Sequence, residues 1–429
     1  MIRFLKEKLS IDSDILWSTL VQLAGKAGQI FIGLFAVKLL TNALGPENYG
    51  VYGKISEFSL FFATAANLGL FGNIVRKIAE RPQDGKLFAN ALFLRVGSAL
   101  LFFGVGALYA LLFIKDPIFL AGTLLFMASL VLDYISSICN GVLQVHYRMG
   151  RSTLALLLGR LFNLGAISLL IFLSKENPVV LSLFFMAPLA GALATAISTY
   201  YFTSQVIKAE WRLDYPLIKS LLWTSLPFGI INLSNTLYFR FIPSALLVKI
   251  LSDKIYGLYD LSLSIATMVS LLSTLFMFSI LPKLKEHLVK GEHQASWALY
   301  KNAHRYLLIG AVGVVSIGTW LAPLSLSLVS SKEFLDPIYW FILPLLLVLA
   351  AVSYFYDLAF LTLFTLEKDG KWMREEFFVL LLASLYFAAV FYSGLELPLK
   401  TALILTGAIL AEGKMAAWGM QQAKQLLNK

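Results

Sequence analysis

The chain alternates between long apolar stretches and short polar segments along its whole length. Stretches of about 20 apolar residues can cross a hydrocarbon core about 30 Å thick as α-helices. About twelve such stretches are predicted. The first six lie near Ile15–Leu44, Tyr49–Val75, Leu87–Ile114, Pro117–Val145, Thr153–Leu173 and Pro178–Ile207. The second six lie near Leu217–Leu251, Ile255–Leu281, Tyr306–Val329, Pro337–Leu366, Trp372–Tyr392 and Pro398–Met420.

Composition agrees with this pattern. Of the 429 residues, 59% are hydrophobic and 14% are charged, whereas soluble domains carry about 25% charged residues. This excludes water-soluble enzymes and soluble nucleic-acid-binding proteins. The single cysteine, Cys139, excludes a disulfide framework and a cysteine-based metal site. The predicted fold class is an all-α polytopic membrane protein with about 12 transmembrane helices.

The net charge of +10 is unevenly distributed among the loops. One set of loops, together with both termini, holds 23 of the 35 Lys and Arg residues, and the opposite loops hold six. Basic loops stay on the cytoplasmic side of a membrane. We therefore expect both termini to be cytoplasmic, with residues 1–14 forming an amphipathic stub rather than a signal peptide.

Two segments suggest an internal repeat. LGPENYGVY at Leu44–Tyr52 and LSDKIYGLY at Leu251–Tyr259 share four residues at one constant offset, and each follows the first helix of its half. Chance similarity between aromatic interfacial loops is the alternative. Six helices per half would give parallel repeats, which favour alternating access by rocking of two lobes.

The repeat also predicts the domain boundaries. They are a stub (1–14), an N-lobe (15–207), a cytoplasmic linker (208–216), a C-lobe (217–420) and a cytoplasmic tail (421–429).

Catalytic motifs are absent from the sequence. It contains no nucleophile elbow, P-loop or dinucleotide fingerprint. The four histidines lack paired metal-ligand spacing, so surface or interface roles are expected for them. No loop is long enough to form a separate catalytic domain, and we expect the protein not to be an enzyme.

Several charges fall within the predicted spans, where each costs about 2.5–3.5 kcal/mol near a helix centre unless it faces protein or water. The basic ones are Lys26, Lys38, Lys54, Arg95, Arg160 and Arg240. The acidic ones are Glu57, Asp133, Asp260, Asp357 and Glu412. Lys38, near a span end, can reach the interface with its long side chain.

The deepest cations lie on polar stripes. Gln22, Lys26 and Gln29 share one face of the first helix. Asn232, Thr236 and Arg240 share a face of the seventh, with Asn235 beside them and Pro227 and Pro243 as candidate bends. Cations with amides suit a phosphate-bearing anion that also carries hydroxyls.

The predicted substrate-binding residues of a cationic cavity are therefore Lys26, Lys54, Arg95, Arg160, Arg240, Gln22, Gln29, Asn232 and Asn235. The alternative for the cations is burial in ion pairs, with Lys54 and Glu57 as the obvious local pair. The acids Glu57, Asp133, Asp260, Asp357 and Glu412 are candidates either for binding a coupling H⁺ or Na⁺ or for balancing the cations. No other cofactor and no metal are expected.

Two segments near the amino terminus resemble a known family of transporters. VKLLTNALGPENYGVYGKISEF at residues 37–58 and NLGLFGNIVRKIAERP at residues 67–82 resemble the amino-terminal signature of Wzx-type oligosaccharide flippases. These are polysaccharide transporters of the multidrug/oligosaccharidyl-lipid/polysaccharide (MOP) superfamily. The motifs are specific only within the first eighty or so residues.

The resemblance implies a MATE-like, V-shaped fold with a cationic cavity between two six-helix lobes. It implies translocation of an undecaprenyl-pyrophosphate-linked oligosaccharide, such as an O-antigen repeat unit, from the inner to the outer leaflet of the cytoplasmic membrane. By position, Lys26, Lys54 and Arg240 would take the place of cavity arginines in related lipid II flippases. Two of the three are lysines, and Ala27 follows Lys26 where an acid is expected.

Other functions remain open. A multidrug or cation antiporter on the same scaffold would favour an acid deep in the first helix, where this chain has Lys26. A membrane scaffold or a glycan polymerase belongs to a different class. The expected partners are the lipid-linked glycan, membrane lipids and polysaccharide-assembly proteins, with no nucleic acid.

Overall fold

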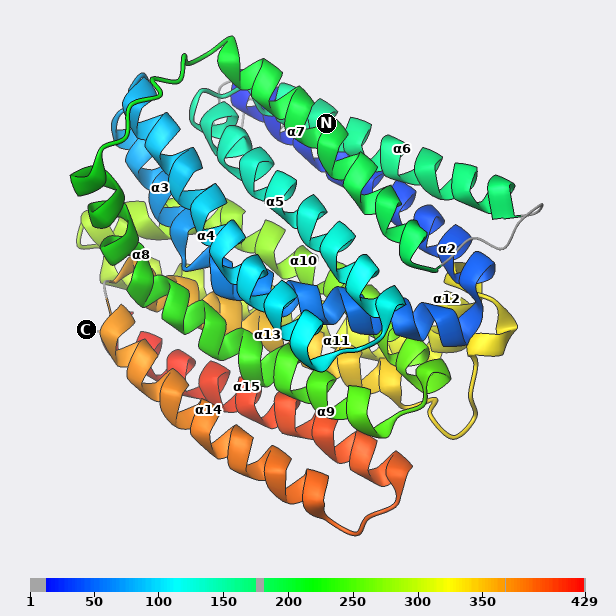
Figure 1. The fold of residues 1–429 in the computed structure, drawn as a ribbon. Coiled ribbons are helices and arrows are strands. Elements are labelled where there is room, and N and C mark those ends of the chain that lie inside the picture. Colours follow the sequence, from blue (N-terminus) through cyan, green and yellow to red (C-terminus); the bar gives the residue numbers. More distant parts are fainter. Residues whose placement is uncertain (1–12, 175–180, 367, 428–429) are drawn as a thin grey trace. The chain divides into compact units, whose positions relative to one another are not determined.

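A computed structural model describes residues 13–174, 181–366 and 368–427, and these residues form helices joined by short connections (Figure 1). The stub and the tail predicted at the two ends fall partly outside the described residues. The helices of the first half are α2 (Ser13–Asn67), α3 (Leu70–Glu80), α4 (Gly85–Phe113), α5 (Pro117–Val145), α6 (Met149–Ser174), η1 (Leu181–Phe185) and α7 (Met186–Ser204). Those of the second half are α8 (Tyr215–Thr236), η2 (Leu237–Phe241), α9 (Ile242–Ile250), α10 (Asp253–Val289), α11 (His293–Trp320), α12 (Ala322–Val329), η3 (Lys332–Phe334), α13 (Ile342–Thr365), α14 (Asp369–Tyr392) and α15 (Leu397–Leu427).

Among the described residues, eight helices are long and apolar enough to cross a membrane, and a bent pair of helices gives a ninth candidate. One of the eight combines the first two predicted spans, because α2 runs through both. The helices α10 and α15 are 37 and 31 residues long and overlap two further predicted spans, although they fall outside this apolar set. Each of the twelve predicted spans therefore has a helical counterpart, and the multi-pass all-α prediction is confirmed.

The boundary between the first two spans differs from the prediction. LGPENYGVY, expected as a turn, forms a kink in α2 at Gly45, whose φ of 69° lies in the left-handed region. Pro46 follows and fits the start of the resumed helix, because its missing N–H would have no partner there. A complete break comes later, at Leu68 (φ 46°) and Gly69 (φ 69°), within the NLGL motif.

Two other helices are interrupted. Between α8 and α9, residues Leu237–Phe241 form a π-helical turn just before Pro243. The ninth predicted span is broken, because α11 and α12 meet at an angle of 71°. A π-helical turn shifts the register of side chains along a helix and is frequent at functional sites.

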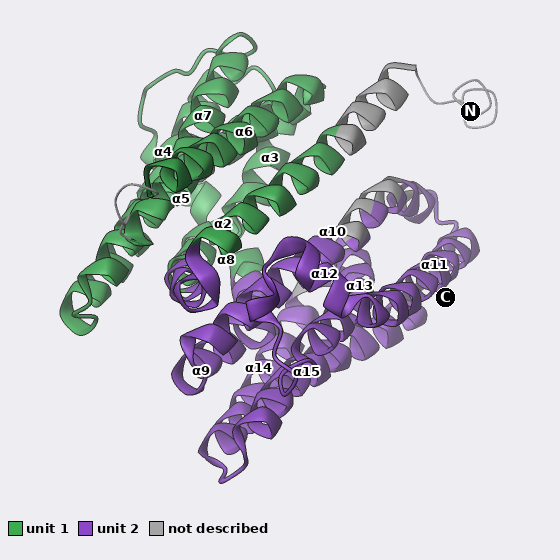
Figure 2. Ribbon diagram, turned by 90° about the vertical axis from the view of Figure 1, so that its right-hand side faces the viewer, with its two compact units in different colours: residues 1–43, 58–229 green, residues 44–57, 230–429 purple. Residues whose placement is uncertain are grey.

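The chain divides into two compact units, coloured separately in Figure 2. Unit 1 consists of Met1–Ala43 and Phe58–Gly229. Within it, α7 packs against α5 and α6, and α5 also packs against α3 and α4. A buried cluster in this unit joins α3, α4 and α5 around Ile74, Phe88 and Val142.

Unit 2 consists of Leu44–Glu57 and Ile230–Lys429. Its central helix is α13, which packs against α10, α11 and α15, while α14 packs on α15. Small residues on α15 permit close approach: a Cβ on Gly419 would come within 2.7 Å of Ala359 Cβ and 2.6 Å of the Trp372 ring.

The compact units differ from the predicted lobes in two segments. Residues 44–57, predicted in the N-lobe, belong to unit 2, and residues 217–229, predicted in the C-lobe, belong to unit 1. Side-chain packing rather than order along the chain sets these boundaries. Helix α2 begins and ends in unit 1 and passes through unit 2 at residues 44–57, whereas α8 begins in unit 1 and ends in unit 2. The lobes 15–207 and 217–420 stay a prediction.

Candidate functional site

A two-point ion pair within the predicted spans joins Arg240 and Glu57 in unit 2. Arg240 Nε donates to both carboxylate oxygens of Glu57 at 3.0 Å, and Nη2 donates to Oε2 at 2.8 Å. The Glu57 side chain is 7% exposed and that of Arg240 is 25% exposed. This two-point pairing satisfies both charges where water is scarce. It is the charge-balancing role predicted for Glu57, and substrate contact by Arg240 stays a prediction.

A second pair joins Lys54 to Asp253 at 2.7 Å, and the ammonium lies 5.4 Å from the centre of the Tyr256 ring. The expected local pair of Lys54 with Glu57 is therefore wrong. Positions three apart on a helix can pair, but each of these two side chains takes a partner in the second half of the chain instead. Asp253 lies between two predicted spans and was not predicted as a partner, because Lys54 lies 199 residues away in the sequence.

The segment 44–57 packs closely against α10. A Cβ on Gly50 would lie 1.8 Å from the Asp253 carbonyl oxygen, and one on Gly257 would lie 2.5 Å from the Pro46 carbonyl oxygen. The two glycines are equivalent positions of the predicted repeat and contact each other, as equivalent residues do near a two-fold axis. Asp260, a predicted acidic site, is half-buried and packs against Gly53.

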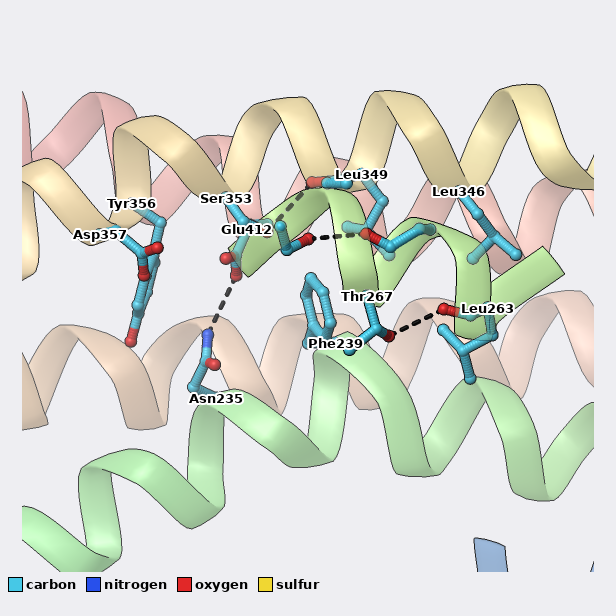
Figure 3. A pocket seen from close by; sticks show the side chains of 13 residues that line it. Asn235, Phe239, Leu263, Thr267, Leu346, Leu349, Ser353, Tyr356, Asp357 and Glu412 are labelled. Carbon is cyan, nitrogen blue, oxygen red and sulfur yellow. Dashed lines mark hydrogen bonds between the residues drawn. The ribbon is translucent and has the colours of Figure 1, made fainter. Parts of the chain in front are cut away.

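A cavity of about 190 Å³, lined by both polar and apolar side chains, lies inside unit 2. Figure 3 shows its lining side chains, which come from α8, η2, α10, α13 and α15. Two predicted acids face it: Glu412 accepts from Asn235 Nδ2 at 3.0 Å, and Asp357 accepts from the Ser273 hydroxyl at 2.8 Å. Hydroxyls of Thr267, Ser270, Ser353 and Tyr356 complete the polar part of the lining, and the described lining residues include no Lys or Arg.

The sequence analysis missed a third buried acid beside this cavity. Glu376 is fully buried, accepts from the Tyr356 hydroxyl at 3.4 Å, and has no described partner at Oε1. It was overlooked because it lies in the first turns of a span that begins among basic loop residues. A signal for this buried acid was the adjacent pair Glu375 and Glu376. Glu375 pairs with the surface cation Lys414 at 2.9 Å. Consecutive residues of a helix point in different directions, so Glu376 faces elsewhere.

In unit 1, Arg95 is 3% exposed and lies inside the packed helices. Its Nη1 donates to the backbone oxygen of Asn67 at 3.2 Å and to the Asn67 side chain, and its guanidinium lies 4.2 Å from the centre of the Tyr134 ring. Asn67 is the last residue of α2 before the break, so Arg95 satisfies a carbonyl that the interrupted helix leaves open. This placement gives Arg95 a structural role at the NLGL motif, and contact with substrate stays a prediction.

Lys26 has a different environment. It is exposed on unit 1 and makes no ion pair with any residue that the structure describes. Gln29 on the same stripe is half-buried, and Gln22 lies outside the residues whose side chains are described. Farther along unit 1, Asp133 on α5 and Arg160 on α6 are both exposed and close enough to interact electrostatically.

The stripe predicted on the seventh helix is only partly regular. Thr236 donates to the Asn232 carbonyl at 2.7 Å, as in an α-helix, and Asn232 is half-buried. The π-helical turn that follows shifts Arg240 relative to the predicted face. Asn235 therefore points to Glu412 and the cavity, while Arg240 points to Glu57.

A metal site of three or more His, Cys, Asp or Glu side chains is not found among the residues described. A small cation in the cavity would instead need hydroxyl and carbonyl oxygens beside the two acids, which are ligands that Na⁺ and other hard cations accept. Protonation of Glu412 or Asp357 needs no such ligand set.

Comparison with known families matches residues 13–329 to the family described as polysaccharide biosynthesis protein. The match covers well over half of the chain, and extends far beyond the amino-terminal motifs. No curated protein matches the sequence.

Solved structures show the same fold. The inward-facing conformation of a multidrug resistance MATE family transporter of the MOP superfamily aligns with a TM-score of 0.70 and 15% identity, over 96% of this chain and 98% of that chain. A MOP superfamily transporter from Pyrococcus furiosus aligns with a TM-score of 0.67 and 16% identity, over 97% of this chain and 96% of that chain. That transporter is described as having a binding pocket of reverse polarity, which suggests a different function for it. At these identities the likeness establishes a MATE-like fold and nothing more specific.

Proposed function

This chain belongs to the polysaccharide biosynthesis protein family, and from that premise we propose that it is a flippase for a polyprenyl-pyrophosphate-linked oligosaccharide. Family and fold together support a multi-pass membrane transporter. The proposal adds the substrate, undecaprenyl-pyrophosphate-linked glycan, and the direction, from the inner to the outer leaflet of the cytoplasmic membrane.

The observation that carries the proposal is the exposure of Lys26. It lies 13 residues after the start of α2 and 19 residues before the kink, which corresponds to about 20 Å and about 28 Å of helix. A cation at this depth cannot face hydrocarbon without a large cost. It therefore faces water or an anionic ligand, and a pyrophosphate supplies the charge while the neighbouring Gln29 offers hydrogen bonds to a sugar.

The other cations contribute less directly. Of the six within the predicted spans, Arg240, Lys54 and Arg95 already have described partners, so substrate would have to compete for them. Arg160 is exposed in the same unit as Lys26 and is the second candidate for the pyrophosphate. The polyprenyl chain stays in lipid during the transfer.

Transport by purified protein in liposomes tests this proposal. A fluorescent lipid-linked oligosaccharide is reconstituted, and its arrival in the opposite leaflet is measured by accessibility to a soluble glycosidase. Lys26→Gln should reduce the rate more than tenfold, and Lys26→Arg should retain most of it because the charge is kept. Lys38→Gln, in the same helix near a span end, is the matched control. Full transport by Lys26→Ala combined with Arg240→Ala would disprove the anion-binding role.

The same preparation separates the alternatives. A flippase moves the glycan without changing its mass, whereas a polymerase lengthens it. Protection of cells from cationic dyes that depends on this chain, without glycan movement, would favour a multidrug antiporter instead.

We further propose that the cavity between Asp357 and Glu412 binds the coupling cation, H⁺ or Na⁺. Two acids and several hydroxyls line it without a balancing Lys or Arg, so a bound cation would lower its electrostatic cost. Glu412→Gln and Asp357→Asn should make transport insensitive to an imposed pH or Na⁺ gradient. Glu375→Gln, whose carboxylate pairs with Lys414 at the surface, is the control and should keep the gradient dependence. Unchanged gradient dependence in both cavity variants would place the coupling site elsewhere.

A further inference from the structure

A second polar cavity lies in unit 1, where the linker between the two halves meets the ends of two helices. It has a volume of about 170 Å³. We call it the linker groove and define it by its lining residues Phe88, Tyr200, Ser204, Ile207, Lys208, Ala209 and Trp211. None of these residues belongs to the predicted substrate or coupling sites.

The linker is held in place against α4. Asn90, fully buried, donates to the Arg212 carbonyl at 2.9 Å and accepts from the Asp214 N–H at 2.9 Å. Lys86 pairs with the Asp214 carboxylate at 2.6 Å. A Cβ on Gly85 would lie 2.1 Å from the Lys208 carbonyl oxygen, so only glycine allows this approach. The groove is therefore a built feature of unit 1.

The chemistry of the groove favours an anion. Lys208 supplies a positive charge, and the Tyr200 hydroxyl and the Trp211 indole N–H supply further donors. The ammonium of Lys208 has no ion-pair partner among the residues that the structure describes. No carboxylate lines the groove, since Asp214 is bound to Lys86 and the exposed Glu210 is not among the lining residues.

The position of the groove matches a lipid headgroup. It lies where α7 ends and α4 begins, which is the level of the membrane surface. The Trp211 ring packs edge-on against the ring of Phe93, with 5.5 Å between the two ring centres. Phe93 lies about two turns into α4. Phe93 on α4 and Ile197 and Tyr201 on α7 are large exposed apolar side chains, as expected of side chains that contact acyl chains. Trp and Tyr concentrate at the headgroup level, and Lys there attracts anionic lipids.

We propose that the linker groove binds the phosphate headgroup of an anionic phospholipid. Lys208 pairs with the phosphate, while Trp211 and Tyr200 donate to its oxygens or to the glycerol. The bound lipid would anchor the linker between the two halves at the membrane surface. This inference does not depend on the glycan substrate.

Lipid binding to the purified full chain tests the proposal. Phosphatidylglycerol and phosphatidylcholine are titrated separately in detergent, and bound lipid is counted by native mass spectrometry. We expect phosphatidylglycerol to bind more tightly, and Lys208→Gln to weaken it roughly fivefold, the factor expected for one basic residue near an anionic surface. Lys219 is an exposed lysine outside the groove. The variant Lys219→Gln should bind phosphatidylglycerol as tightly as the wild type does.

Three results would overturn the proposal: equal binding of the two lipids by the wild type, unchanged phosphatidylglycerol binding by Lys208→Gln, or capture of undecaprenyl phosphate but not phosphatidylglycerol at Lys208. Trp211→Leu provides a second variant that keeps all charges. Its lipid affinity should fall while its thermal unfolding stays near that of the wild type, and a normal affinity in Trp211→Leu would also contradict the proposal.

Discussion

Charged side chains inside the predicted spans find their partners by three-dimensional packing rather than by neighbourhood in the sequence. Arg240 and Glu57 are 183 residues apart, and Lys54 and Asp253 are 199 apart. The sequence could predict that these charges need compensation, because an isolated charge in hydrocarbon is costly. It could not predict which partner each one takes, because that depends on how α2 and α10 pack.

The Arg240–Glu57 pair gives a stability prediction. Glu57→Gln leaves a guanidinium without its counter-charge in a largely buried place, and breaking a buried pair from one side costs about 3–5 kcal/mol. The comparison is Lys290→Gln, which removes an exposed pair with Glu286 whose side chains are 55% and 58% exposed. Such surface pairs contribute about 0–1 kcal/mol.

Thermal unfolding in detergent measures the difference. The midpoint of Glu57→Gln should fall well below those of the wild type and Lys290→Gln, and adding Arg240→Met to Glu57→Gln should recover part of the loss. Equal midpoints for the two single variants would show that the Arg240–Glu57 pair contributes nothing to stability.

Asp214 gives a pH prediction. Its hydrogen bond from Lys86 holds the pKa of the carboxyl below its ordinary value. A carboxyl whose pKa is lowered on folding stabilises the folded state above its unfolded pKa of about 3.9, and this contribution is lost as the pH falls through the lower, folded pKa. The midpoint difference between the wild type and Asp214→Asn should therefore stay constant between about pH 5 and about pH 8 and should shrink in more acidic buffers. A difference that grows on acidification would contradict the sign.

At the level of helices, apolar length predicted the elements well and the interruptions poorly. Spans of about 20 apolar residues identify themselves by composition alone. The break after Asn67 lies at the left-handed residues Leu68 and Gly69. The π-helical turn lies just before Pro243, a predicted bend, and the bend between α11 and α12 lies beside Pro323. Arg95 supplies a donor to the open end of α2, and nothing in the local sequence points to it.

The close approach of the two repeat segments gives a prediction at this scale. A Cβ on Gly50 would meet the Asp253 carbonyl oxygen at 1.8 Å, so Gly50→Ala must displace backbone and should destabilise by about 1–3 kcal/mol. Gly33→Ala in the same helix meets nothing within 4 Å and should be neutral or stabilising, because alanine favours helix. Thermal midpoints of the two variants decide the matter, and a stable Gly50→Ala protein would mean that the segments are not in tight contact.

For the whole molecule, the sequence predicted the fold class and the family resemblance, and both are confirmed. The sequence did not predict the boundaries of the compact units. Residues 44–57 group with unit 2 and residues 217–229 with unit 1, because α2 runs from unit 1 into unit 2 and back, and α8 runs from unit 1 into unit 2.

Orientation in the membrane follows from charge and gives the last prediction. With 23 basic residues in one set of loops and at the termini, against six in the opposite loops, the first set should be cytoplasmic. Cys139 is fully buried, so background labelling should be low, and replacing it with serine removes it entirely. Lys115→Cys and Lys219→Cys then place single thiols at exposed positions, which the loop charges predict to lie on opposite sides of the membrane. In intact cells stripped of their outer barrier, a membrane-impermeant maleimide should label Lys115→Cys alone, and after permeabilisation it should label both. Labelling of Lys219→Cys in intact cells would show the opposite orientation. The glycan would then be taken from the other leaflet.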